Sequence, residues 1–142
     1  MASSIIFSAA GKVLRPENRK LSSRLKMEYK LQRGEGRTRV ILRSVEMGQD
    51  LLVRIFNEGV HIGAVAIGEF DREHQRASVS VFTRLGHKDD ALAQKAAYAI
   101  SKYTQKTVCV VAGVHLDNIT EEEIGQILKN SFRLIKALLK KY

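Results

Sequence analysis

Three of the four histidines lie in short polar segments that flank predicted strands. His61, His87 and His115 stand in the segments NEGVHIG, LGHKDD and GVHLDN, which also carry glycine, carboxylate and amide groups. A neutral imidazole both donates and accepts a hydrogen bond, and imidazole and carboxylate groups also ligate metal ions. These segments can therefore hold a heterocyclic ligand or a metal, provided that the fold brings them together.

The second of these segments precedes a predicted helix. A helix that begins near Asp89 exposes unpaired amide groups, and His87 and Lys88 stand just before it, so this helix start is a plausible phosphate anchor. Gly63, Gly86 and Gly113 allow a ligand or another backbone to approach closely. The alternative is that His87 and Asp89 only cap the helix.

The third segment offers a carboxylate and an amide beside its histidine. His115 and Asp117, together with His61, can bind a metal or hydrogen-bond a heterocycle. Asp117 and Asn118 are also ordinary turn-forming residues, and a histidine at the end of a strand can be purely structural. Both interpretations stay open on spacing alone.

Alternating apolar and polar residues predict the strands that carry these segments. Such patterns cover residues 25–33, 37–45, 51–57, 60–69 and 76–84. They predict a meander of about five antiparallel strands. A later apolar run, residues 106–114, has the composition of a short buried strand and contains Cys109, which we expect in the core.

Two helices are predicted in the second half of the chain. The first follows Asp89 and buries a stripe made of Leu92, Ala96, Ile100 and Tyr103. The second begins at a capping box formed by Thr120 and Glu123. Its predicted sheet-facing residues are Ile124, Ile127, Leu128, Ile135 and Leu138.

The order of these elements predicts an α+β fold with two layers. The layers are a mostly antiparallel sheet of five to six strands with one βαβ crossover, and two long helices on one face of it. If strands 76–84 and 106–114 are parallel, and strand 60–69 pairs antiparallel with 76–84, the three histidine segments meet at one sheet edge. Ligands favour such an edge, beyond the carboxyl ends of parallel strands.

The other face of the predicted sheet is partly apolar through Leu52, Phe56 and Phe82. Because an uncovered apolar face of this kind usually has a partner, we expect a homodimer or another complex.

The length and the net charge of the chain limit the classes of protein to which it can belong. The 142 residues suit one domain, which we place at residues 25–142 behind a basic, loose arm of residues 1–24. The net charge is +9, and residues 1–45 hold eleven basic and only three acidic side chains. Such an arm can bind an anionic partner or simply be solvated, but no RNA-binding strand signature or recognition helix supports nucleic acid. The opening MASSIIFSAAG lacks a basic n-region, so we expect a cytosolic protein.

Local motifs do not support catalysis. The sequence contains no GxGxxG, Walker A, GxSxG or HExxH pattern, and its single cysteine excludes an internal disulfide.

Three ordered blocks resemble a known family. The stretches HIGAVAIG, SVSVFTRLGHKDD and VCVVAGVHLDNITEEEI are similar to the prenylated-flavin chaperones, the D-type small subunits associated with gallate and related hydroxybenzoate decarboxylases. The similarity runs from about Gln49 to Leu138. The stretch from Asp89 to Val111 is also similar, more weakly, to small proteasome-assembly chaperones, which suggests a shared fold.

The resemblance implies a non-catalytic protein that carries prenylated FMN and aids the maturation of a UbiD-type decarboxylase. Its implied cofactor-binding positions are those that fall within the matching blocks: His61, Gly63, Gly86, His87, Lys88, Asp89, His115, Asp117 and Asn118. Three alternatives stay open. They are an assembly chaperone or interaction scaffold, a metal-dependent enzyme built on the histidines, and, ranked last, a nucleic-acid-binding protein.

Overall fold

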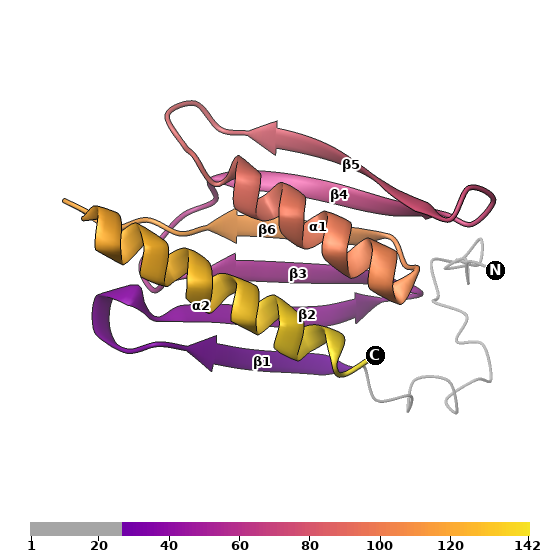
Figure 1. Cartoon of the computed structure of the whole chain (residues 1–142), viewed down its shortest axis with the longest axis horizontal. Helices are drawn as coiled ribbons and strands as arrows, with labels where there is room; N and C mark the ends of the chain where they lie inside the picture. Colours follow the sequence, from indigo (N-terminus) through magenta and orange to yellow (C-terminus); the bar gives the residue numbers. More distant parts are fainter. Residues whose placement is uncertain (1–26) are drawn as a thin grey trace, which may run out of the picture.

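One mixed sheet carries two helices on a single face in residues 27–142, the part of the chain that the computed structural model describes (Figure 1). The arm expected over residues 1–24 lies outside this range. The elements are β1 (Glu28–Arg33), the short 3-10 helix η1 (Gly36–Thr38), β2 (Val40–Met47), β3 (Asp50–Phe56), β4 (Ala64–Asp71), β5 (Arg76–Thr83), α1 (Asp90–Thr104), β6 (Val108–Gly113) and α2 (Glu121–Leu139).

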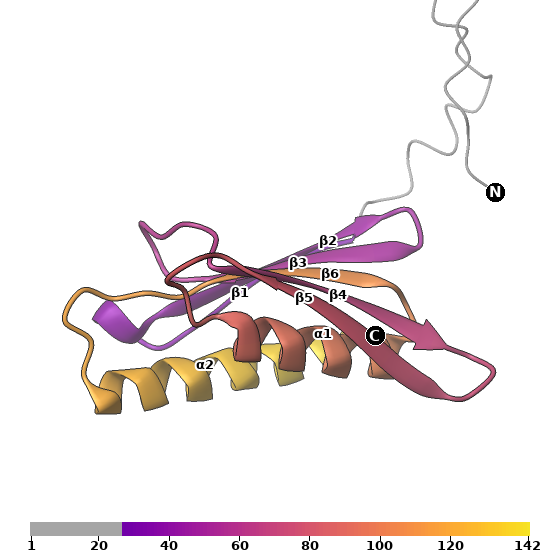
Figure 2. The same cartoon turned by 90° about the horizontal axis from the view of Figure 1, so that it is seen from above.

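The predicted fold class is confirmed. The six strands lie in the order β1-β2-β3-β6-β4-β5, and every neighbouring pair is antiparallel except β3 and β6. Both helices lie on the same side of the twisted sheet and leave the other side bare (Figure 2). The molecule is thus the predicted two-layer α+β arrangement with one parallel pair.

The predicted five-strand meander is wrong in one respect. The strands β1, β2 and β3 form a meander and β4 pairs with β5, but β6 inserts between β3 and β4. The strands β5 and β6 run in the same direction, as expected, yet they are separated by β4. The parallel neighbour of β6 is β3, with Phe56 opposite Gly113 at their carboxyl ends.

The core lies between the sheet and the two helices. Leu42, Val53 and Val110 are fully buried on this face. Leu92, Ala96 and Ile100 of α1 are buried as predicted, and α1 packs on β4, β5 and β6. The helix α2 buries Ile127, Leu134, Ile135 and Leu138. Three predicted positions are wrong, because Tyr103, Ile124 and Leu128 are exposed at the ends or flanks of the helices.

The other face of the sheet is uncovered by any described element. Leu52 and Phe56 are half-buried there, whereas Phe82 is 70% exposed and Ile67 is 48% exposed. Cys109 also belongs to this face and not to the core, because it lies opposite Leu52 and Ile67 in the ladder. Partial burial raises the pKa of its thiol, which lowers its nucleophilicity.

Candidate functional site

The three histidine segments converge at one edge of the sheet. The ring centroids of His61 and His87 lie 4.7 Å apart in an edge-to-face arrangement, and those of His61 and His115 lie 6.4 Å apart. His61 comes from the β3–β4 loop, His87 from the β5–α1 loop, and His115 from the segment after β6. Because β3, β5 and β6 all end at this edge and β4 begins there, the topology itself brings the imidazoles together.

A buried carboxylate lies beside this histidine cluster, by which we mean His61, His87 and His115. Asp89 is only 6% exposed, and one of its carboxylate oxygens accepts a hydrogen bond from the backbone amide of Val114 at 3.2 Å. Burial raises the pKa of Asp89 above its usual range, while this amide and the nearby histidines act in the opposite direction. Asp89 occupies the position before α1 but makes no side-chain cap there.

Two glycines make the close packing at this edge possible. A Cβ atom on Gly63 would lie 1.7 Å from a carboxylate oxygen of Asp89, and one on Gly113 would lie 2.2 Å from the carbonyl oxygen of His61. Both distances are far below van der Waals contact. The approaching groups are therefore parts of the protein itself, whereas we predicted that a glycine here could admit either a ligand or backbone.

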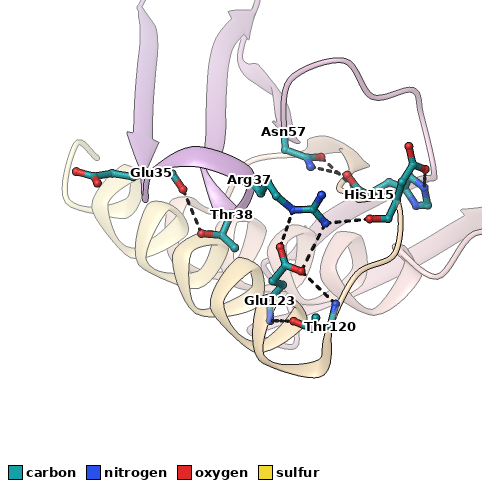
Figure 3. A network of polar contacts seen from close by, with 8 residues as sticks. Glu35, Arg37, Thr38, Asn57, His115, Thr120 and Glu123 are labelled. Carbon is teal, nitrogen blue, oxygen red and sulfur yellow. Dashed lines mark hydrogen bonds and ion pairs between the residues drawn. The ribbon is translucent and has the colours of Figure 1, made fainter.

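Asn57 fixes the backbone of His115. Its side-chain amide nitrogen donates to the carbonyl oxygen of His115 at 2.6 Å, and its side-chain oxygen accepts from the amide of His115 at 3.0 Å (Figure 3). Asn57 is 4% exposed and directly follows β3. Asn57 belongs to no motif, and an asparagine at the end of a buried-strand pattern is only a weak signal of such a role.

A second network holds the segment between β6 and α2. The guanidinium of Arg37, in η1, donates to a carboxylate oxygen of Glu123 at 2.9 Å and to the backbone carbonyl of Asp117 at 2.9 Å (Figure 3). The predicted capping box is confirmed, because Thr120 and Glu123 exchange both hydrogen bonds. The ion pair lowers the pKa of Glu123 and raises that of Arg37. Arg37 was also missed, since its partners lie at least 80 residues away.

The β3–β4 loop crosses the open face and roofs a small pocket. The guanidinium of Arg84 donates to the carbonyl of Ile62 at 2.8 Å and holds this loop from the β5 side. The pocket beneath has a volume of about 270 Å³ and is lined by Arg54, Phe56, Val60, His61, Ile62, Val111 and Gly113. A larger apolar groove of about 590 Å³ lies on the helix layer around Tyr98 and Phe132, and no histidine lines it.

The remaining candidate residues surround the cluster. The imidazole of His115 lies 3.3 Å from a carboxylate oxygen of Asp117, and both side chains are exposed. Asn118 and Gly86 adopt left-handed backbone conformations, with φ of 52° and 75°, so both fulfil the turn-forming role that their types allow. Lys88 is exposed at the start of α1.

Within residues 27–142, no group of three or more histidine, cysteine or acidic side chains is arranged to hold a metal ion. The metal-binding alternative for His61, His115 and Asp117 therefore finds no preformed ligand set. Neither α1 nor α2 has the length and apolarity that a membrane crossing needs.

A family model described as the prenylated flavin chaperone LpdD-like domain matches residues 34–142. The chain belongs to this chaperone family. The match begins about fifteen residues before the resemblance noted from Gln49 and so includes η1 with Arg37, which the shorter resemblance had left out.

Solved structures share the chaperone's fold. A chain from "Crystal Structure of a Novel Chaperone Complex for Yeast 20S Proteasome Assembly" has a TM-score of 0.50 and 16% sequence identity, covering 79% of this chain and 98% of that chain. At that identity the likeness concerns the fold alone. No curated protein matches the sequence.

Proposed function

We propose that this chaperone is a non-catalytic carrier that binds prenylated FMN and helps a UbiD-type aromatic acid decarboxylase to mature. The observation that carries the proposal is the convergence of His61, His87 and His115, from three separate loops, beside the buried carboxylate of Asp89. Membership of the prenylated flavin chaperone family supplies the class of ligand.

The chemistry of the edge suits a flavin. The flavin ring system carries hydrogen-bond donors and acceptors along one rim and broad apolar faces, and imidazoles provide both hydrogen bonds and aromatic surface. In this proposal the ring lies against the histidine cluster and Lys88, with Asp117 within reach of His115. The remaining candidate residues support the backbone around this site without contacting the ring. They are Gly63, Gly86, Asp89 and Asn118. A carrier must also release its cargo, which neutral hydrogen bonds of modest strength permit.

A homodimer is the assembly that we propose for the carrier. The large apolar side chains exposed at one corner, on and beside β4 and β5, are Ile67, Phe82 and Leu85, and β5 is an edge strand with unpaired backbone groups. A second copy related by a two-fold axis would cover this corner, since a two-fold interface joins the same patch of both copies. The corner lies on the β4–β5 side of the sheet, so the pocket beside Arg54 on β3 stays open.

Flavin binding can be measured directly. Titration of the full chain with prenylated FMN under anaerobic conditions, followed by fluorescence, should show saturable binding. His115→Ala should weaken it about tenfold or more, because a hydrogen-bonding imidazole and its aromatic surface are lost. His74→Ala is the matched control, since His74 lies in the β4–β5 turn, where its ring bonds to Asp71. Absence of binding, with no effect on activation of a decarboxylase client, would refute the proposal.

A second candidate function is an assembly chaperone or interaction scaffold. It is favoured by the bare apolar corner around Phe82 and by the shared fold with a proteasome-assembly chaperone complex. This function predicts that Phe82→Lys abolishes co-purification with a large oligomer while His61, His87 and His115 can be replaced without effect. Sensitivity to the histidine replacements alone would favour the flavin carrier instead.

A further inference from the structure

We propose that Arg54 and Arg43, on the open face of the sheet, form a binding site for a phosphate monoester, and that this site takes the phosphate of the flavin. The inference rests on the proposed function for the identity of the ligand, but not for the anion site itself. The site adjoins the histidine cluster through His61, which lines the same pocket as Arg54.

The two arginines lie side by side, with no acidic partner among residues 27–142. Arg43 on β2 is directly opposite Arg54 on β3, and Lys30 on β1 is directly opposite Arg43, so three cations form one row across the sheet. Opposed like charges destabilise an antiparallel pair. Within residues 27–142, none of the three forms an ion pair. Glu28 is the nearest carboxylate by register, one diagonal step from Arg43.

Arg43 also has an unused hydrogen-bond donor. Its Nε is buried and has no hydrogen-bond partner among the described residues. Burying such a donor is costly unless a ligand or water satisfies it, and a charged donor is more costly than a neutral one. The guanidinium of Arg54 lies over the ring of Phe56, 5.6 Å from its centroid, which holds this cation at the pocket wall.

The shape of the pocket agrees with part of a larger ligand. Its volume of about 270 Å³ is just below the roughly 300–1,000 Å³ of a complete small-molecule site. Phe56, Val60 and Val111 provide apolar walls, and Arg54 provides the charge. A flavin that contacts the histidine cluster with its ring can therefore extend its ribityl chain through this pocket toward the arginines.

The alternative phosphate anchor at the start of α1 is electrostatically poorer. Asp89 and Asp90 both stand at that helix start, and Asp90 is in its first turn. A dianionic phosphate there would meet two carboxylates, whereas at the arginine pair it meets two cations. A guanidinium group also binds phosphate with two parallel hydrogen bonds from one rigid, permanently charged group.

The test compares prenylated FMN with its dephosphorylated form, prepared with a phosphatase, in anaerobic titrations. The wild type should bind the phosphorylated flavin about tenfold or more tightly. Arg54→Gln should bring the two affinities close together, because it weakens binding of the phosphorylated flavin far more than binding of the dephosphorylated flavin. Arg54→Lys should restore part of the preference, since it keeps the charge without the paired donors. Arg133→Gln removes the same charge from the exposed side of α2 and should change nothing.

A second measurement separates this inference from the proposed function. Inorganic phosphate, titrated into the ¹⁵N-labelled full chain, should shift the backbone amides of residues 43, 54 and 56 and the Nε resonances of both arginines. Shifts at residues 89–92 instead, or a phosphate preference that survives Arg54→Gln, would overturn the inference. Phosphate binding at Arg54 without any flavin binding would refute the flavin function and leave the anion site standing.

Discussion

Asn57 determines the position of His115 although it need not touch a ligand. Both polar atoms of its side chain bond to the backbone of His115, so Asn57→Ala leaves a partly buried amide and carbonyl unpaired. We expect this substitution to lower the free energy of unfolding by about 1–3 kcal/mol and to weaken flavin binding. Glu58→Ala, at the exposed next position, is the control and should change stability by less than about 0.5 kcal/mol. Urea denaturation of both variants provides the comparison, and equal stabilities would contradict the assignment.

Gly63 has to be a glycine because Asp89 occupies the space of its missing side chain. Gly63→Ala should displace the carboxylate and lower the free energy of unfolding by about 1–3 kcal/mol. Gly125→Ala is the matched control, because a Cβ there meets nothing within 4 Å and α2 gains a better helix former. The control should be neutral or stabilising. If both variants melt at the same temperature, the close contact at Gly63 has no energetic importance.

The raised pKa of Asp89 makes the free energy of unfolding fall as the pH rises. Because burial raises its pKa in the folded state, the folded chain binds more protons than the unfolded chain between the two pKa values. The contribution of Asp89 is therefore most favourable below the ordinary carboxyl pKa and declines as the pH rises through the raised value. Asp89→Asn keeps an oxygen to accept from Val114 and does not titrate.

In urea denaturation at a series of pH values, the stability of the wild type relative to Asp89→Asn should thus decline as the pH rises. Asp90→Asn, at the exposed neighbouring position, should retain the decline. Parallel pH profiles for the wild type and Asp89→Asn would show that the carboxyl group is not perturbed by burial.

At the scale of elements, η1 and the start of α2 act as one support for the histidine edge. Arg37 binds the Asp117 carbonyl and the Glu123 carboxylate, and Asn130 of α2 donates to the carbonyl of Thr38. Arg37→Ala should therefore speed amide hydrogen exchange in residues 115–123 while changing global stability little, because the ion pair is exposed. Lys129→Ala, on the exposed side of α2, should leave that exchange unchanged. Unchanged exchange in Arg37→Ala would rule out this support.

The sequence predicts individual elements better than it predicts their neighbours. Local periodicity and the capping box at Thr120 were sufficient for the strands, the helices and the two-layer class. The place of β6 between β3 and β4 was missed, because sheet order depends on contacts between residues at least 40 positions apart. The apolar run from Val108 to Gly113 did carry a signal, since a strand buried on both sides belongs inside a sheet.

Only part of the candidate site was predicted, because the rest of it also depends on contacts between distant segments. The three histidines lie next to strand ends. Because the directions of these strands were predicted correctly, their convergence was predicted too, although the strand order was wrong. Asn57, Arg37 and Arg84 were missed because their partners are distant in the sequence and, apart from the Glu123 carboxylate, are backbone groups without a sequence signature. Arg54 alternates in the sequence with the buried residues of its strand, which indicates only a solvent-facing position. Its relation to Arg43 depends on the register between β2 and β3.

For the molecule as a whole, one face of the sheet forms the core and the other is open to solvent and available for binding. One face buries the core beneath α1 and α2, whereas the other exposes Phe82 and Ile67 at one side and the arginine pair at the other. Phe82→Lys should convert the proposed homodimer to a monomer with unchanged circular dichroism, because the core is on the opposite face. Light scattering coupled to gel filtration measures this directly. If the wild type is monomeric at high protein concentration, the proposed homodimer is refuted.

The central claim, that three imidazoles form one flavin site, can be tested on the histidines themselves. The chain has four histidines, and His74, in the β4–β5 turn, lies outside the histidine cluster and serves as an internal reference. Imidazole resonances of the ¹⁵N-labelled protein, recorded anaerobically during addition of prenylated FMN, should shift for His61, His87 and His115 with one common dissociation constant and stay constant for His74. Saturating flavin that leaves the three cluster resonances unmoved would contradict the account.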